Sequence, residues 1–225
     1  MTNHLSSKMP PPVTFPPLVL LGGSFDPVHQ GHLWMAWAVQ ARLPTAELRF
    51  LPTAASPFKT GQTPARHRRA MLRLALRDTP FGLETLEIRQ RQTCYTLDTL
   101  QAIRTRLGPD RPLIFVLGQD AFESLPRWKG GYALLELAHL WVFSRPTQGD
   151  RLALPASLQL RQADSPQSLL AQPAGLVWLD ERIPPAISST KIRQYLATSR
   201  PLLPPRVYRY TRQSDLYGKT QTHDC

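Results

Sequence analysis

Two histidines that flank a glycine are the first feature of this sequence with an obvious chemical use. His29 and His32 stand on either side of Gly31, shortly after Gly22 and Gly23. Imidazoles can donate hydrogen bonds to phosphate oxygens, and the pair has no adjacent cysteine or carboxylate that would indicate zinc. We therefore interpret both as groups that stabilise the charge of a phosphate-transfer transition state. The alternative is that His32 only caps a helix and His29 is exposed.

The residues around the histidines predict an anion-binding turn. An apolar run, residues 18–21, ends at Gly22 and Gly23, which is typical of a buried strand followed by a tight turn. Glycines let the backbone approach a ligand without a Cβ in the way. Apolar residues then recur at helical spacing from His32, and the N-terminus of such a helix attracts an anion. Neither the dinucleotide fingerprint nor the P-loop describes this pattern.

A second group of donors lies near the other end of the chain. Residues 187–193 read ISSTKIR, with Ser189 and Thr190 at an expected helix start and Arg193 about one turn later. Hydroxyl and backbone donors could hold a polyphosphate there, while the guanidinium neutralises charge. An ordinary N-cap followed by a surface arginine is the alternative. Beside the first group, we favour the phosphate-binding interpretation.

The other apolar patterns predict the elements that must position these groups. Strands are expected at residues 18–21, 48–51, 113–117, 140–143 and 176–179, and the alternation of Leu86 and Ile88 suggests another. Helices are expected from His32, from a Thr63 N-cap with Pro64 as first residue, over 97–107 and 134–138, from Ser188 or Ser189 through Leu196, and from Pro205.

This alternation of strands and helices predicts one α/β unit. We expect a Rossmann-like doubly wound parallel sheet with helices on both faces, and ligands at the carboxyl ends of its strands. Residues 18–217 would form the single domain. Residues 1–17 read as a disordered proline-rich leader and residues 218–225 as a tail.

Composition limits the partners and the compartment. The 225 residues hold 27 Lys and Arg against 16 Asp and Glu, a formal charge of +11, so partners are expected to be anionic. No apolar run approaches the roughly 20 residues that cross a bilayer. The two cysteines form no disulfide framework or metal cluster, and prolines interrupt the N-terminus where a signal peptide would be apolar. A cytoplasmic protein without membrane contact is expected.

The strings on which this reasoning rests also resemble a known family. The string GGSFDPVHQGH, residues 22–32, is similar to the signature of the His-x-Gly-His nucleotidyltransferase superfamily, and in its longer form to bacterial nicotinate-nucleotide adenylyltransferases. Residues 187–193 are similar to the Ile-Ser-Ser/Ala-Thr-x-Ile-Arg element of that family. The resemblance, which spans about residues 18–217, implies that His29, His32 and Arg193 are catalytic. It also implies an ATP site made of Gly22, Gly23, Ser24, Phe25, Gly31, His32, Ser189, Thr190 and Arg193.

The same resemblance implies a site for nicotinate mononucleotide in the middle of the chain. Gly118 and Asp120 correspond to the family's Gly-x-Asp, and Trp128 to a tryptophan that stacks on the pyridine ring. Core packing is the alternative for Trp128. Tyr95 and Thr96 resemble the family's Ser/Thr-Tyr-Thr, where backbone donors meet the nicotinate carboxylate. Such donors would favour the acid over the amide.

Two further segments bear on the family pattern. Where many members have Pro-Asn-x-x-Pro-Pro-His-Lys, residues 52–59 read PTAASPFK, so Phe58 replaces a substrate-binding histidine. Lys59 is retained and is expected to bind substrate. Arg145, within Ser-Arg-Pro, is expected near the ATP phosphates.

The implied reaction is an adenylyl transfer in NAD biosynthesis. The phosphate of nicotinate mononucleotide would attack the α-phosphorus of ATP in line, giving nicotinate adenine dinucleotide and pyrophosphate without a covalent intermediate. The nucleophile is already an anion, so the protein must align two polyanions and neutralise charge rather than supply a base. Mg²⁺ would be carried in on ATP, and no protein metal site is expected.

Two other functions stay open from the sequence. A related transferase could act on phosphopantetheine, flavin mononucleotide or nicotinamide mononucleotide. A nucleic-acid-binding module is suggested by the charge and by Arg66, His67, Arg68 and Arg69, although a solvated helix face explains such a run equally well. We favour the enzyme, with no nucleic-acid partner, because no recognised nucleic-acid motif accompanies the basic run. The sequence leaves the oligomeric state undetermined.

Overall fold

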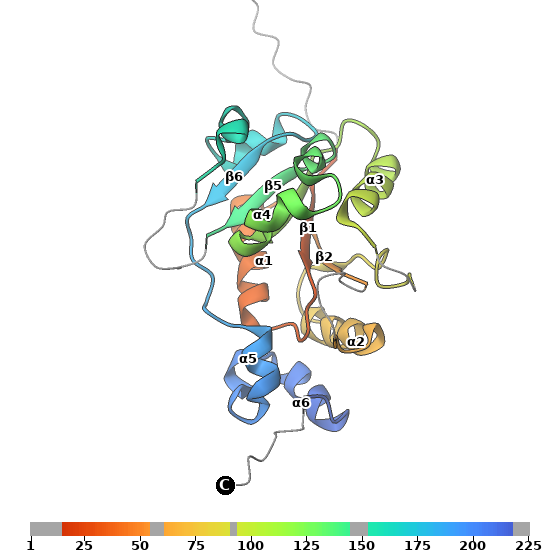
Figure 1. Ribbon diagram of the computed structural model, residues 1–225. Coiled ribbons are helices and arrows are strands. Elements are labelled where there is room, and N and C mark those ends of the chain that lie inside the picture. The colour runs from red at the N-terminus through yellow and green to blue at the C-terminus, as the bar shows by residue number, and fades with distance from the viewer. Residues whose placement is uncertain (1–14, 55–60, 91–93, 145–152, 218–225) are drawn as a thin grey trace, which may run out of the picture.

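A parallel sheet organises the computed structural model, which describes residues 15–54, 61–90, 94–144 and 153–217 (Figure 1). Within these residues the strands are β1 (Leu18–Gly23), β2 (Glu47–Pro52), β3 (Gly82–Leu83), β4 (Leu113–Gly118), β5 (His139–Phe143) and β6 (Val177–Asp180). Their order is β3-β2-β1-β4-β5-β6, and every neighbouring pair is parallel. This is the Rossmann-like order, so the predicted fold class is confirmed.

The strands are mainly apolar because β1, β2, β4, β5 and β6 each contribute residues to two cores. Successive side chains of a strand point to opposite faces of the sheet. In β1, Val19 and Leu21 join one buried cluster, whereas Leu18 and Leu20 join the other. Strands covered on both faces read as continuous apolar runs, which explains why they were recognisable in the sequence.

Helices cover both faces of this sheet. They are α1 (Gln30–Arg42), α2 (Ala65–Leu76), α3 (Thr96–Leu107), α4 (Gln119–Ser124), α5 (Ser189–Gln194) and α6 (Pro205–Gln213). Helices α1, α2, α5 and α6 contribute buried residues to one cluster, and α3 and α4 to the other. In Figure 1, α5 and α6 gather below the sheet, near the start of α1. None of the described helices is long and apolar enough to cross a bilayer.

Short 3₁₀ helices fill much of the remaining chain. They are η1 (Leu125–Arg127), η2 (Gly131–Glu136), η3 (Ala156–Arg161), η4 (Pro166–Leu170), η5 (Leu196–Thr198) and η6 (Arg200–Leu202). Helix α5 ends at Gln194, and a separate 3₁₀ turn contains Leu196, so the expected single helix through Leu196 is wrong. The helix expected at 134–138 is the 3₁₀ helix η2.

The third strand was predicted in the wrong place. Strand β3 is Gly82–Leu83, and Leu86 and Ile88 lie in turns after it. The side chain of Glu84 explains the difference, because its Oε1 accepts hydrogen bonds from the backbone N–H groups of Thr85 and Leu86. These bonds turn the chain away from β2, and Ile88 is buried without being in a strand.

The start of α2 also differs from its prediction. Pro64, not Thr63, is the N-cap residue, and the helix begins at Ala65. Thr63 instead directs its backbone N–H at Oδ2 of Asp26, 3.0 Å away. A contact with a residue far away in sequence has therefore taken the place of a local cap.

Candidate active site

The loop between β1 and α1 forms the centre of the site. It begins at Gly23 and ends at His29, the N-cap of α1. Phe25 has a φ of 49° and is buried, with its ring 4.9 Å from that of His32 and 5.3 Å from that of Phe50. The loop is thus packed onto the end of the sheet, which fixes where α1 begins.

The two histidines of this loop stack on each other. Their ring centroids are 3.7 Å apart and the ring planes meet at 23°. The backbone N–H of His29 donates to Nδ1 of His32 at 3.2 Å, and the backbone N–H of His32 donates to the backbone oxygen of His29 at 3.0 Å. When neutral, His32 therefore carries its proton on Nε2 and presents a donor there. His29 is buried, so the alternative with an exposed His29 is wrong.

Helix α5 meets this loop although it lies far away in sequence. Nη1 of Arg193 donates to the backbone oxygen of Asp26 at 2.7 Å, and Oγ of Ser189 donates to that of Pro27 at 3.0 Å. Nη2 of Arg193 also lies 3.3 Å from Oγ1 of Thr190. The structure therefore brings both predicted groups of phosphate ligands to the carboxyl end of β1.

Glycines permit this close approach at two positions. A Cβ on Gly31 would lie 3.1 Å from the His29 ring and 3.4 Å from the backbone oxygen of Pro185, just before α5. A Cβ on Gly22 would lie 2.5 Å from the ring of Phe115. The start of α1, the segment before α5 and β4 can pack at these distances only because Gly31 and Gly22 have no side chain.

The residues expected to hold the second substrate lie at α3, at α4 and just after α4, on the other face of the sheet. Tyr95 is the N-cap of α3 and is exposed, while Asp120 is exposed in the first turn of α4. Trp128 is partly buried against the core and donates through Nε1 to Oγ of Ser124 at 3.0 Å. The indole is therefore both packed and accessible, which agrees with either interpretation of Trp128.

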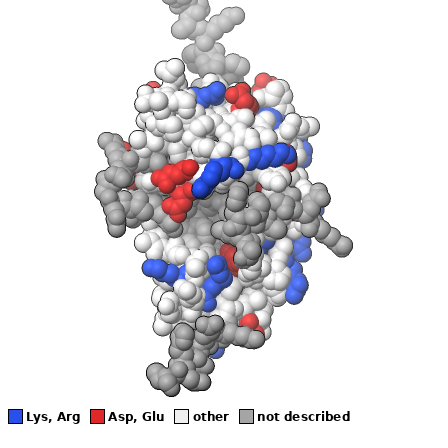
Figure 2. Space-filling view, viewed as in Figure 1, with Lys and Arg blue, Asp and Glu red and all other residues white. Residues whose placement is uncertain are grey.

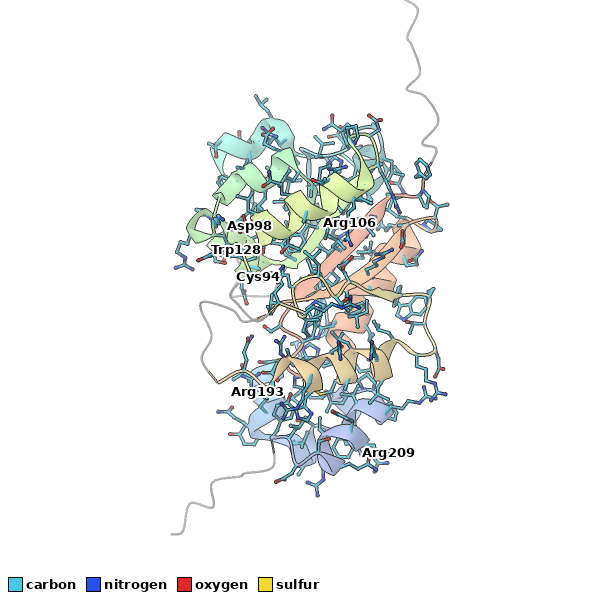
Figure 3. The ribbon with its side chains drawn as sticks, turned by 90° about the vertical axis from the view of Figure 1, so that its right-hand side faces the viewer. Cys94, Asp98, Arg106, Trp128, Arg193 and Arg209 are labelled. Carbon is cyan, nitrogen blue, oxygen red and sulfur yellow. The ribbon has the colours of Figure 1, made fainter. Side chains whose placement is uncertain are left out.

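Lys129 connects two of these segments. Its Nζ lies 2.8 Å from both carboxylate oxygens of Asp98, in the first turn of α3, and 5.1 Å from the centroid of the Tyr95 ring. Figure 3 shows Asp98 close to Trp128, with Arg193 on α5 below them. Thr96 begins α3 in the same place, and Gly118 caps α4. The structure thus gathers Tyr95, Thr96 and Trp128. Lys59, Arg145 and Phe58 lie outside the described residues.

Arg68, expected on a solvated helix face, is instead buried next to the site. It is 1% exposed, and its guanidinium donates to the backbone oxygens of Ser24 at 2.9 Å, Thr53 at 2.8 Å and Ala54. Burial lowers the pKa of Arg68, and the charge of Asp26 acts against that change. The arginine ties the loop after β1 to the loop after β2.

The supposed basic face around Arg68 is therefore not one surface. Nδ1 of His67 is 2.9 Å from the hydroxyl of Tyr210 on α6. In the view of Figure 2, Lys and Arg side chains stand in separate groups among neutral and acidic ones. Helical spacing could have revealed the buried arginine, because Arg68 shares a face of α2 with Leu72 and Ala75.

Glu87 adds a second buried charge beside this arginine. It is 2% exposed, and burial raises the pKa of its carboxyl, whereas a hydrogen bond from Thr99 and the charge of Arg68 oppose the rise. No local pattern indicated this carboxylate, because Glu87 lies in the turns that replace the expected strand.

The donors of the site suit phosphate better than a resident metal ion. Among the described residues, no group of three or more His, Cys, Asp or Glu side chains is placed to hold a metal. Imidazole, hydroxyl and guanidinium groups surround the loop instead, and Mg²⁺ prefers carboxylate, carbonyl and phosphate oxygens.

Comparison with known proteins gives the same assignment as the motifs. The family model of cytidylyltransferase-like proteins matches residues 20–195. A probable nicotinate-nucleotide adenylyltransferase of Hahella chejuensis is 42% identical over 90% of this chain and 96% of its own length. One from Aeromonas salmonicida is 40% identical, over 89% and 97%.

Solved structures show the same fold at lower identity. A Plasmodium falciparum nicotinic acid mononucleotide adenylyltransferase complexed with NaAD has a TM-score of 0.69 and 19% identity, covering 90% of this chain and 98% of that one. The same enzyme complexed with APC has a TM-score of 0.66, at the same coverage. With the fold, the motifs and these matches together, the chain belongs to the cytidylyltransferase-like family and, within it, to the nicotinate-nucleotide adenylyltransferases.

Proposed function

We propose that the chain transfers the adenylyl group of ATP to nicotinate mononucleotide, releasing pyrophosphate and forming nicotinate adenine dinucleotide. The observation that carries this proposal is the meeting of two distant motifs: Arg193 and Ser189 bond to the loop that ends at the paired histidines. Similarity to relatives of 35–42% identity supports the choice of acceptor.

The ATP phosphates would lie at the start of α1. The first N–H groups of a helix have no partner within it and face an anion favourably. Nε2–H of His32 would donate to an oxygen of the α-phosphate, and Gly22, Gly23, Ser24, Phe25 and Gly31 would line the turn. Ser189, Thr190 and Arg193 would contact the β- and γ-phosphates, where Arg193 draws the developing charge toward pyrophosphate. Mg²⁺ would arrive bound to these phosphates.

Nicotinate mononucleotide would lie against the starts of α3 and α4 and the segment after α4. Backbone donors at Tyr95 and Thr96 would receive the nicotinate carboxylate, and Trp128 would stack on the pyridine ring. Asp120, two residues after Gly118, is exposed at the start of α4 and would accept hydrogen bonds from ribose hydroxyls. Lys59 and Arg145, together with a cytoplasmic location, stay predictions.

A pyrophosphate-release assay tests this function. The protein, ATP and magnesium are mixed in turn with nicotinate mononucleotide, nicotinamide mononucleotide, flavin mononucleotide and phosphopantetheine. We expect the highest kcat/KM with nicotinate mononucleotide. A higher value with any other acceptor would reject the proposed substrate, and salt-sensitive DNA binding without turnover would reject the enzyme.

A further inference from the structure

The last described residue of the chain reaches back to the loop between β1 and α1. The hydroxyl of Tyr217 donates to Oδ1 of Asp26 at 2.6 Å. The Tyr217 oxygen in turn lies 3.2 Å from Oγ1 of Thr63, while the backbone N–H of Thr63 donates to Oδ2 of Asp26 at 3.0 Å. Three segments from the beginning, the middle and the end of the domain thus close one ring of hydrogen bonds.

This ring holds a buried carboxylate. Asp26 is 3% exposed, and a buried charge is tolerated only when it is paired and hydrogen-bonded. Both of its oxygens receive a donor, and the positive charge of Arg68 acts on the same group. Burial and the hydrogen bond to Asp26 raise the pKa of Tyr217, so its hydroxyl stays protonated and remains a donor.

Asp26 is also where the loop meets α5. Its backbone oxygen accepts the 2.7 Å bond from Arg193, and the next residue, Pro27, accepts from Ser189. His29 follows two residues later. A shift of Asp26 would therefore move the anchor of Arg193 and the start of the histidine pair together.

We propose that Tyr217, acting through Asp26, is a positioning residue for the ATP side of the reaction. This inference rests on the proposed function for the identity of the second substrate. The contacts that join Tyr217, Asp26 and Arg193 do not depend on that identity. Tyr217 touches neither Trp128 nor Tyr95 in the described contacts, and Figure 3 shows Trp128 well above Arg193 on α5. Its loss should therefore affect the ATP side and spare the other substrate.

A pair of matched tyrosine variants isolates this role. Tyr217→Phe removes the hydroxyl that reaches Asp26. Tyr210→Phe is the control: its hydroxyl also links the C-terminal segment to α2, through the 2.9 Å contact with His67, but the contact does not involve the loop. Both variants keep their aromatic rings, so purely structural effects should be similar.

The readouts separate positioning from stability. For Tyr217→Phe we expect kcat to fall about tenfold, as for the loss of a hydrogen bond to a charged group. The Kd of an ATP analogue with a methylene bridge between the α- and β-phosphorus atoms, measured by calorimetry, should rise about fivefold, and the KM of nicotinate mononucleotide should change less than about twofold. Tyr210→Phe should change none of these values more than about twofold.

Opposite results would overturn the role. These are a wild-type Kd and kcat in Tyr217→Phe, or the same losses in both variants. If Tyr217→Phe does not fold, Thr63→Val removes the hydroxyl beside Tyr217 but keeps the backbone donor to Asp26. It should raise the Kd of the analogue about threefold, since one neutral hydrogen bond is lost, and an unchanged Kd would contradict us. Because analogue binding needs no acceptor, this test stands even if wild type fails to use nicotinate mononucleotide.

Discussion

At the scale of single residues, one nitrogen atom explains why His32 is suited to phosphate. Its Nδ1 already accepts the backbone N–H of His29, so this bond restrains the ring and a neutral His32 carries its proton on Nε2. The capping contact and the proposed catalytic contact therefore use different atoms. A donor fixed in this way costs no reorganisation when charge develops in the transition state.

Changing His32 to Ala should lower turnover far more than stability. Loss of one positioned donor to a developing oxyanion costs about 10²–10³ in kcat, whereas loss of an N-terminal capping contact costs about 1 kcal/mol. Pyrophosphate release and thermal melting of the purified variant measure the two effects. His67→Ala, on α2, is the control and should keep its kcat. Wild-type turnover in His32→Ala would refute the role.

Arg68 is a residue whose loss should act through folding. Arg68→Met leaves the buried backbone oxygen of Ala54 and the partly buried ones of Ser24 and Thr53 without this donor. We expect a loss of at least about 3 kcal/mol in the free energy of unfolding, because unsatisfied buried groups carry their full desolvation cost. Arg73→Met, on the same helix but exposed, should change stability by less than about 0.5 kcal/mol. Equal urea midpoints for the two variants would contradict this.

At the scale of elements, the carboxyl end of β1 depends on its contact with β4. The two strands are neighbours in the sheet, where the chain order reverses, which is the usual place of ligand sites in such folds. Gly22 is in the last part of β1, and the ring of Phe115 fills the space where its side chain would be. The glycine thus serves packing as well as the proposed phosphate turn.

Gly22→Ala should therefore be corrected by a change in β4. The new Cβ would lie 2.5 Å from the Phe115 ring, and overpacking of this kind costs about 1–3 kcal/mol. Gly22→Ala should therefore cost less stability when it is added to Phe115→Leu than when it is added to wild type. Gly118→Ala serves as control, since nothing lies within 4 Å of its added Cβ. Additive losses in urea unfolding would show that the two residues do not interact.

At the scale of the whole molecule, a buried histidine couples folding to pH. His139 is fully buried at the start of β5. Its Nε2 faces the backbone oxygen of Gln172 at 2.9 Å, and its Nδ1 accepts from the backbone of Leu176 at 3.0 Å. The ring therefore ties the chain before β6 to β5 in its neutral form. Burial lowers the pKa of His139 to about 4.

The fold should lose stability as the pH falls from about 6.5 to about 4. Below pH 6.5, His139 is protonated in the unfolded chain but stays neutral in the folded chain. Proton binding therefore stabilises the unfolded state until the pH reaches the pKa of the folded state. The shift from 6.5 to about 4 corresponds to on the order of 3 kcal/mol. Urea unfolding at several pH values between 4 and 7 should show that the free energy of unfolding changes less steeply with pH in His139→Leu than in wild type. Parallel slopes would argue against this histidine.

The domain boundaries also belong to this scale. We propose that residues 18–217 form one domain, since Tyr217 bonds to Asp26 across nearly its whole length. Of the expected leader, residues 15–17 are described, and the backbone oxygens of Pro16 and Pro17 accept bonds from Arg111 and Glu47. The disorder expected for residues 1–14 and the tail at 218–225 stay predictions.

The sequence alone determined the elements whose pattern is local and the two strings that resemble the family. Mainly apolar runs revealed β1, β2, β4, β5 and β6, because burial on both faces favours apolar side chains at most positions. The histidine and ISSTKIR segments were recognised because the order of their residues is itself the signal. What no local pattern could give is which distant groups meet.

Tertiary structure determines which of these distant groups are in contact. The bond of Tyr217 to Asp26 joins residues 191 positions apart, and that of Arg68 to Ser24 joins residues 44 apart. Helical spacing places Arg68 on an apolar face of α2, but no periodicity in the chain shows which distant groups such a side chain bonds to. Burial turned Arg68 from an expected surface charge into the tie between two loops, and Glu84 turned an expected strand into a turn. Each outcome follows from donors and acceptors that must be paired once water is excluded.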